Sequence, residues 1–195
     1  MGVEERMADR CNTIRLYSFQ TDVVYQVLKR DGVCYSKEEY VRKKYKESAK
    51  VFINAYGWVV KEAQHIVPKP EGAEYPYWAF TDLYNVDQTG DGHVLTLDVP
   101  IGEAILFDMF DWTKIMQMHY IGENESEEAT FSEELKNMGM NEFQIMTSNF
   151  YPEQKARIQE SWKRLFGHQQ AGDNSGVHSV QAGLWCIKDE WIVKE

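Results

Sequence analysis

The sequence predicts a single α+β domain in which a mixed and split sheet is flanked by helices. Segments that alternate like strands and segments with helical spacing follow one another without the regular βαβ order of a parallel sheet. The 195 residues are 43% hydrophobic, which is enough for a buried core without disulfide or metal support. Residues 1–12 lack periodicity and are predicted to be a flexible segment, so the domain is predicted to span residues 13–195.

The first elements are a strand, a short helix, a long helix and an aromatic strand. Alternation predicts a strand over Thr13–Phe19, and an apolar stripe predicts a helix over Asp22–Arg30. Apolar positions at helical spacing begin a long helix at Lys37, in which Gly57 predicts a kink or the close packing of another element. Aromatic residues predict a strand over Tyr75–Phe80.

The rest of the chain is predicted to add strands first and helices later. A polar turn is predicted over Asp87–Gly92, and it leads into a strand over Val94–Val99. A short apolar run over Ile105–Phe107 extends the sheet, and helical spacing over Asp108–Tyr120 predicts a helix. The remaining predictions are a solvated acidic loop over Glu123–Glu128, a helix capped by Thr130 and Glu133 and closed by Gly139, a strand over Phe143–Phe150, a helix from Pro152 to Phe166, a loop over Gln169–Gly176 and a strand over Val177–Ile187.

Charge and composition exclude several kinds of partner. Lys and Arg number 21 against 31 Asp and Glu, and the resulting net charge of −10 repels nucleic acid and anionic lipid. No apolar run approaches the roughly 20 residues of a membrane span, and no signal peptide is recognised. Cys11, Cys34 and Cys186 are scattered, which is typical of a reducing compartment. We therefore expect a cytoplasmic protein that binds neither nucleic acid nor membrane.

Familiar catalytic and metal-binding motifs are missing from the sequence. It contains no HExxH, CxxC, GxSxG, GxGxxG or phosphate-binding loop, so a metal site is not expected. Asp87–Gly92 resembles part of a calcium loop, but a polar turn between two strands explains the same residues better. Asp108 and Asp111 begin a predicted helix, where capping is favoured over a ligand or acid–base role.

Aromatic residues give the best indication of a binding site. Because strand side chains alternate, Tyr75, Tyr77 and Ala79 are expected on one face and Pro76, Trp78 and Phe80 on the other. Either set could line a core or a ligand pocket. The residues expected to converge on the ligand are Tyr17, Gln20, Trp78, Trp112 and Gln181; no catalytic residue is assigned.

Several segments resemble an uncharacterised bacterial family, domain of unknown function 3841. The resemblance lies in Leu16–Gln20 followed by a helix and Gly32-Val33, Pro70–Gly72 with Tyr75–Phe80, Asp108 with Asp111-Trp112, and Gln181–Trp185. It covers most of residues 13–195 in order, and YPxWA and DxxDW are its most specific parts. The family implies no activity.

A second resemblance is to the small ADP-ribosyltransferases. A first strand, a short helix ending near Gly32 and a late strand with Gln181 and Ala182 are similar to their layout. The resemblance implies a split sheet with NAD in its cleft. Where relatives carry Gln-Ala-Glu, this sequence has Gly183 in place of the Glu that polarises the ribose, and Ser18 stands where several members have His. The missing carboxylate favours binding over transfer.

The sequence thus predicts a protein that binds a nucleotide-like ligand of the NAD or ADP-ribose type. Two alternatives stay open. One is a protein-interaction module, antitoxin-like or immune-modulating, whose acidic surface meets a basic protein surface. The other is an active ADP-ribosyltransferase or NAD hydrolase. Fold resemblance does not decide among them.

Overall fold

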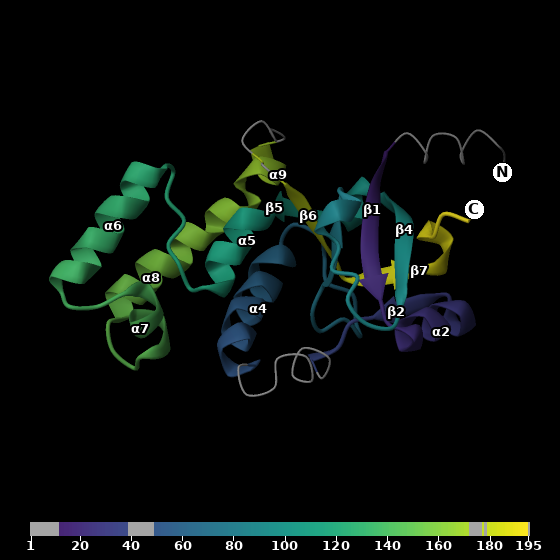
Figure 1. Ribbon diagram of the computed structural model, residues 1–195, viewed down its shortest axis with the longest axis horizontal. Helices are drawn as coiled ribbons and strands as arrows, with labels where there is room; N and C mark the ends of the chain where they lie inside the picture. The colour runs from purple at the N-terminus through teal and green to yellow at the C-terminus, as the bar shows by residue number, and fades with distance from the viewer. Residues whose placement is uncertain (1–11, 39–48, 172–176, 178, 195) are drawn as a thin grey trace.

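The fold is built on a five-stranded antiparallel sheet, seen in a computed structural model that describes residues 12–38, 49–171, 177 and 179–194 (Figure 1). Its strands, in spatial order, are β4 (His93–Pro100), β1 (Thr13–Gln20), β3 (Tyr77–Phe80), β6 (Val180–Leu184) and β5 (Ile105–Asp108). A separate two-stranded antiparallel sheet pairs β2 (Val33–Tyr35) with β7 (Cys186–Lys188). The α+β prediction is confirmed, but the sheet is antiparallel throughout its described strands rather than mixed. The N-terminal segment 1–11 lies outside the described residues.

The helices lie mostly beyond one side of the five-stranded sheet (Figure 1). They are α4 (Ala49–Ala63), α5 (Met109–Met116), α6 (Glu125–Asn137), α7 (Glu142–Thr147), α8 (Pro152–Ser161), a 3₁₀ turn (Trp162–Phe166) and α9 (Gly167–Ala171). Figure 1 shows α6, α7 and α8 at the end of the molecule farthest from the small sheet. The helix α2 (Asp22–Asp31) lies at the opposite end, beside β2 and β7.

Strand alternation separates two hydrophobic clusters. The helix-side cluster joins Phe107 of β5 to buried residues of α4 to α8, with Trp78 of β3 packed against it. The α2-side cluster takes alternate residues of the same sheet, including Leu16 and Leu97, and packs them against α2 and β7. β3 and β5 contribute side chains to both clusters because successive residues point to opposite faces, whereas β1, β4 and β6 contribute buried residues to the α2-side cluster.

Some boundaries shift in a way that matters for the site. The aromatic strand is shorter than predicted, because Tyr75 precedes β3 and packs in the helix-side cluster while Tyr77 and Ala79 lie in the α2-side cluster. The predicted last strand is divided at Trp185 into β6 and β7, which belong to different sheets. A continuous α4 passes through Gly57, and no atom lies within 4 Å of where its Cβ would be, so close packing there is wrong.

Three local predictions in the helical part are wrong for the same reason. Glu123–Glu128 is not a loop: Asn124 caps α6, and its side chain accepts from the backbone N–H of Glu127. The predicted cap Thr130 lies inside α6, where its hydroxyl bonds back to the carbonyl of Ser126. Phe143–Phe150 is not a strand, because a capping box starts the short helix α7 there. In both segments the start of the helix is set by a capping residue that does not belong to the apolar pattern.

Other predictions of helix ends are confirmed by the local geometry. Pro152 occupies the start of α8, where its missing N–H costs no hydrogen bond. Gly32 ends α2 with φ of 75°, and Gly139 follows α6 with φ of 71°, both in the left-handed region. The predicted loop 169–176 begins inside α9, and residues 172–176 lie outside the described residues.

Both edges of the main sheet are occupied by later parts of the chain. At the β5 edge, the backbone N–H of Leu106 donates to Oε1 of Gln169 at 2.9 Å, and Nε2 of Gln169 donates to the carbonyl of Ala104 at 2.9 Å. At the β4 edge, the backbone N–H of Val193 donates to the carbonyl of Thr96. These contacts satisfy backbone groups that would otherwise template pairing with another chain.

Candidate functional site

An aromatic cluster lies between the main sheet and helices α4 and α5. The rings of Trp78 and Trp112 have centroids 5.0 Å apart, and Tyr56 lies 5.5 Å from Trp78 and 5.6 Å from Trp112. Phe107 meets Trp78 edge-on at 5.9 Å. The indole N–H of Trp78 donates to the hydroxyl of Tyr56 at 2.9 Å. The structure thus brings together Trp78 and Trp112, two predicted ligand residues that are far apart in the sequence. Both pack in or against the helix-side cluster.

Gln181 lies on the same face of the sheet as this cluster. It stands opposite Phe80 on β3 and opposite Phe107 on β5. A Cβ at Gly183, two residues along, would approach Trp78 at 3.5 Å, which fixes the direction of the odd-numbered side chains of β6. Gln181 therefore projects between two phenylalanines in the middle of the sheet.

The amide of Gln181 has no hydrogen-bond partner within the described part of the chain, although the residue is only 4% exposed. Every fully buried side-chain nitrogen and oxygen among the described residues does have a partner. The two amide atoms of Gln181 must therefore reach the small exposed part of the residue. An amide held at a nearly closed surface, with its donors and acceptor unused, is available to a ligand.

Tyr17 and Gln20 lie on opposite faces of β1. Tyr17 pairs with Phe80 across the β1–β3 boundary, so it shares the face of Gln181 and is partly buried. Gln20 alternates onto the α2 side with Leu16 and is 9% exposed. Its Nε2 donates to the hydroxyl of Ser18 at 2.8 Å. Four of the five predicted ligand residues thus share one face, and Gln20 does not.

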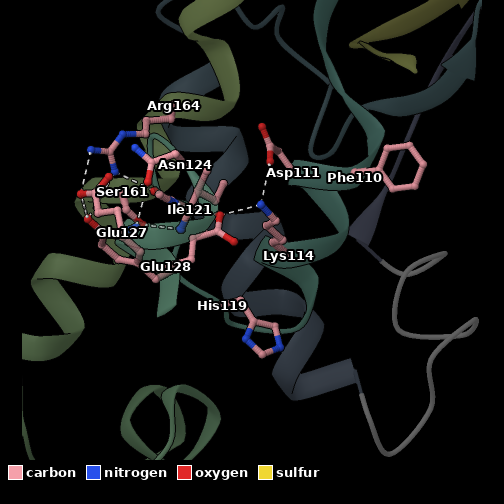
Figure 2. A network of polar contacts seen from close by, with 12 residues as sticks. Phe110, Asp111, Lys114, His119, Ile121, Asn124, Glu127, Glu128, Ser161 and Arg164 are labelled. Carbon is pink, nitrogen blue, oxygen red and sulfur yellow. Dashed lines mark hydrogen bonds and ion pairs between the residues drawn. The ribbon is translucent and has the colours of Figure 1, made fainter. Parts of the chain in front are cut away.

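The two aspartates at the start of α5 have separate structural roles. Asp108 is 3% exposed, and its side chain accepts from the backbone N–H of Phe110 at 2.7 Å, as a helix cap does. Burial raises the pKa of Asp111, and Lys114 lies 3.5 Å from its carboxylate. Lys114 also donates to Glu128 at 2.6 Å. Figure 2 shows this chain of ion pairs linking α5 to α6.

Further polar contacts hold the segment between α5 and α6. Glu127 accepts from the backbone N–H of Glu123 and from the hydroxyl of Tyr120 at 2.7 Å. These two hydrogen bonds lower the pKa of Glu127. The guanidinium of Arg164 donates to the carbonyl of Ile121 at 2.6 Å and lies 3.4 Å from Glu127 (Figure 2). The sequence shows the acidic residues but not their partners, because Arg164 is distant along the chain.

A pocket of about 340 Å³ lies at the helical end of the molecule. Its lining comprises Tyr120, Asn124, Ser126, Glu127, Thr130, Phe131, Glu134 and Arg157. Tyr120 stacks on Phe131 at 4.4 Å, and Arg157 is paired with Glu134 at 2.5 Å. None of the predicted ligand residues lines it. No sequence motif indicates this pocket, because it is formed where α6, α8 and the preceding linker meet.

His119 forms an ion pair beside this region. Its Nδ1 lies 2.5 Å from Oε2 of Glu142, and this hydrogen bond raises the pKa of His119. The other carboxylate oxygen of Glu142 accepts from the backbone N–H of Tyr120. In Figure 2 the His119 ring points away from the ion pairs of Lys114. The pair connects the start of α7 to the segment that follows α5.

The polar turn before β4 is held by its own side chains. Oδ1 of Asp87 accepts from the backbone N–H of Thr89 at 3.0 Å and from its hydroxyl at 2.6 Å. The described residues contain no group of three or more His, Cys, Asp or Glu side chains that could hold a metal ion. No helix among them is long and apolar enough to cross a membrane.

The comparison with protein families covers nearly the whole chain. The family model described as Domain of unknown function (DUF3841) matches residues 15–193, which include the whole main sheet except its first residues and all the helices described above. No curated protein and no solved structure matches the chain. The likeness to ADP-ribosyltransferases therefore stays a prediction. Because the match covers more than half of the sequence, the chain belongs to the DUF3841 family.

Proposed function

We propose that the protein binds a nucleotide-like small molecule, of the NAD or ADP-ribose type, on the aromatic face of its five-stranded sheet. The observation that carries the proposal is the unpaired amide of Gln181, which is only 4% exposed. Its amide atoms reach only a small exposed area, so water solvates them in part. A ligand that hydrogen-bonds to the amide would gain about 0.5–1.5 kcal/mol for each bond.

The neighbours of Gln181 suit a flat ligand. Phe80 and Tyr17 are partly buried beside it, and Phe107 is buried on its other side. Flat apolar rings around a small number of polar groups are the usual design of a small-molecule site. The rings supply contact area, and the amide supplies orientation.

Binding without group transfer is favoured by the packing at Gly183. A Cβ at this position would lie 3.3 Å from Cβ of Pro76, which is a tight contact, and 3.5 Å from Cζ3 of Trp78, which is an ordinary one. Because the residue here is glycine, the position supplies no acid to stabilise positive charge on a ribose. We expect incubation with NAD to release no nicotinamide.

Calorimetric titration tests the proposal. NAD and ADP-ribose are titrated to about 1 mM into the wild-type protein, Gln181→Leu and Gln20→Leu. We expect binding by the wild type, affinity at least about tenfold weaker for Gln181→Leu, and unchanged affinity for Gln20→Leu. The Gln20 variant is the matched control, because it makes the same substitution on the opposite face of the same sheet. Absence of heat with both ligands would refute the proposal.

A further inference from the structure

The aromatic face has an amide to offer a ligand but no uncommitted cation in its described part. Arg15 lies on β1, two residues before Tyr17 and on the same face. Its Nε donates to Asp98 at 2.5 Å and its Nη2 to the same carboxylate at 3.0 Å. A phosphate would have to compete with this bidentate pair on a protein whose net charge is −10. Recognition through phosphate is therefore disfavoured.

The amide of Gln181 is fixed in position by its strand. It lies in β6, which is paired on both sides, with β3 and with β5. Phe80 and Phe107 flank it in register. A glutamine amide presents an N–H donor and a carbonyl acceptor side by side in one plane. Its complement is a planar group that presents an acceptor and a donor at the same spacing.

We infer that Gln181 selects a ligand by a planar edge that carries a hydrogen-bond donor beside an acceptor. A primary carboxamide has such an edge, and so does the N6/N7 edge of adenine, which Gln side chains pair with bidentately. This inference rests on the proposed function and names the part of the ligand that reaches the sheet. The phosphates of a nucleotide would then lie outside the contact.

Replacing the hydrogen-bond donor of the ligand by an acceptor should abolish its match to the amide of Gln181. Nicotinic acid presents two acceptor oxygens where nicotinamide presents one acceptor and one donor. Inosine presents a carbonyl where adenosine presents an amino group. In either case the carbonyl of Gln181 faces another acceptor, and a bidentate pair of this kind discriminates by about tenfold or more.

The test compares matched probes by ligand-observed NMR titration. Adenosine is compared with inosine, and nicotinamide with nicotinic acid, on the wild-type protein, Gln181→Glu and Gln181→Met. We expect the wild type to prefer the amino or amide member of at least one pair by about tenfold or more. Gln181→Met should lose that preference, whereas the carboxylate of Gln181→Glu, which only accepts hydrogen bonds, should still favour the member that carries an N–H donor. Gln181→Met keeps the length of the side chain and guards against a Gln181→Glu variant that fails to fold, which circular dichroism detects.

The outcomes separate this inference from the proposed function. If the wild-type protein binds both members of each pair equally, or if Gln181→Met keeps the preference, the inference is overturned while ligand binding stands. If no probe binds and NAD and ADP-ribose give no heat, the proposed function falls together with the inference.

Discussion

Replacing Gln181 by methionine should stabilise the unliganded protein. The residue is 4% exposed and its amide has no partner among the described residues. Methionine has nearly the same length and carries no group that needs a hydrogen bond. Removing an unpaired polar group of this kind recovers about 1–3 kcal/mol, and we expect about 1–2 kcal/mol because the amide retains some contact with solvent. For a chain of this size that raises Tm by about 2–8 °C.

The matched control is Gln20→Met, for which the opposite sign is expected. Gln20 is 9% exposed, but its Nε2 donates to the hydroxyl of Ser18 at 2.8 Å. That hydroxyl in turn donates to the carbonyl of Trp78 at 2.7 Å. Loss of one buried hydrogen bond lowers the free energy of unfolding by about 0.5–1.5 kcal/mol. The two variants thus differ in hydrogen bonding while the change in side chain is the same.

Urea denaturation and scanning calorimetry measure both variants. A stability change is read as a shift of the denaturation midpoint at an unchanged slope. If Gln181→Met lowers the midpoint as much as Gln20→Met does, the amide of Gln181 is satisfied in solution, and the reasoning about an available ligand partner is refuted. If it rises, the residue trades stability for a function, as binding residues commonly do.

Three further predictions test other parts of the structure. Gln169→Ala removes both hydrogen bonds to the β5 edge. We expect the free energy of unfolding to fall by about 1–2 kcal/mol and hydrogen exchange at the amide of Leu106 to become faster. Unchanged exchange at Leu106 would contradict the contact. Because the bond to Glu142 raises the pKa of His119, the pair's stabilisation is fully present below about pH 6.5 and is lost as the pH rises through the raised pKa. The half-exposed ring limits it to less than about 1 kcal/mol, and Glu142→Gln should therefore destabilise more near pH 6 than near pH 8, whereas equal effects at both would count against the pair. Burial raises the pKa of Cys186 to about 11, so only about 0.1% of this thiol is thiolate at about pH 8. We expect iodoacetamide at that pH to label Cys186 only after the protein is unfolded, as detected by mass spectrometry. Labelling of the native protein would show the thiol to be accessible.

Local pattern was enough to predict the elements whose own residues determine them. β1 and β4 alternate because each faces a core on its α2 side, and the structure pairs them along their full length. The helix from Pro152 begins where predicted because proline and the apolar stripe act within that segment. These signals do not depend on what the segment meets elsewhere in the chain.

The acidic segment was mispredicted because its partners are distant. Clustered glutamates repel one another in isolation, which favours a solvated loop. In the folded protein Glu128 is paired with Lys114 of α5, and Glu127 accepts from Tyr120 and lies near Arg164. Those contacts neutralise the first turn of α6, where negative charge also suits the helix dipole.

The site shows the same division between sequence and structure. The sequence by itself determined that the chain carries strands rich in aromatic residues, a net charge that repels phosphate backbones, and a glycine in place of an acid at position 183. Only the tertiary structure decided that Tyr17, Trp78, Trp112 and Gln181 share a face while Gln20 does not. The order β3-β6-β5 places two phenylalanines beside Gln181 instead of a hydrogen-bonding partner. Whether an amide is satisfied depends on what packs against it, and strand order, which is set by contacts between distant segments, fixes those neighbours.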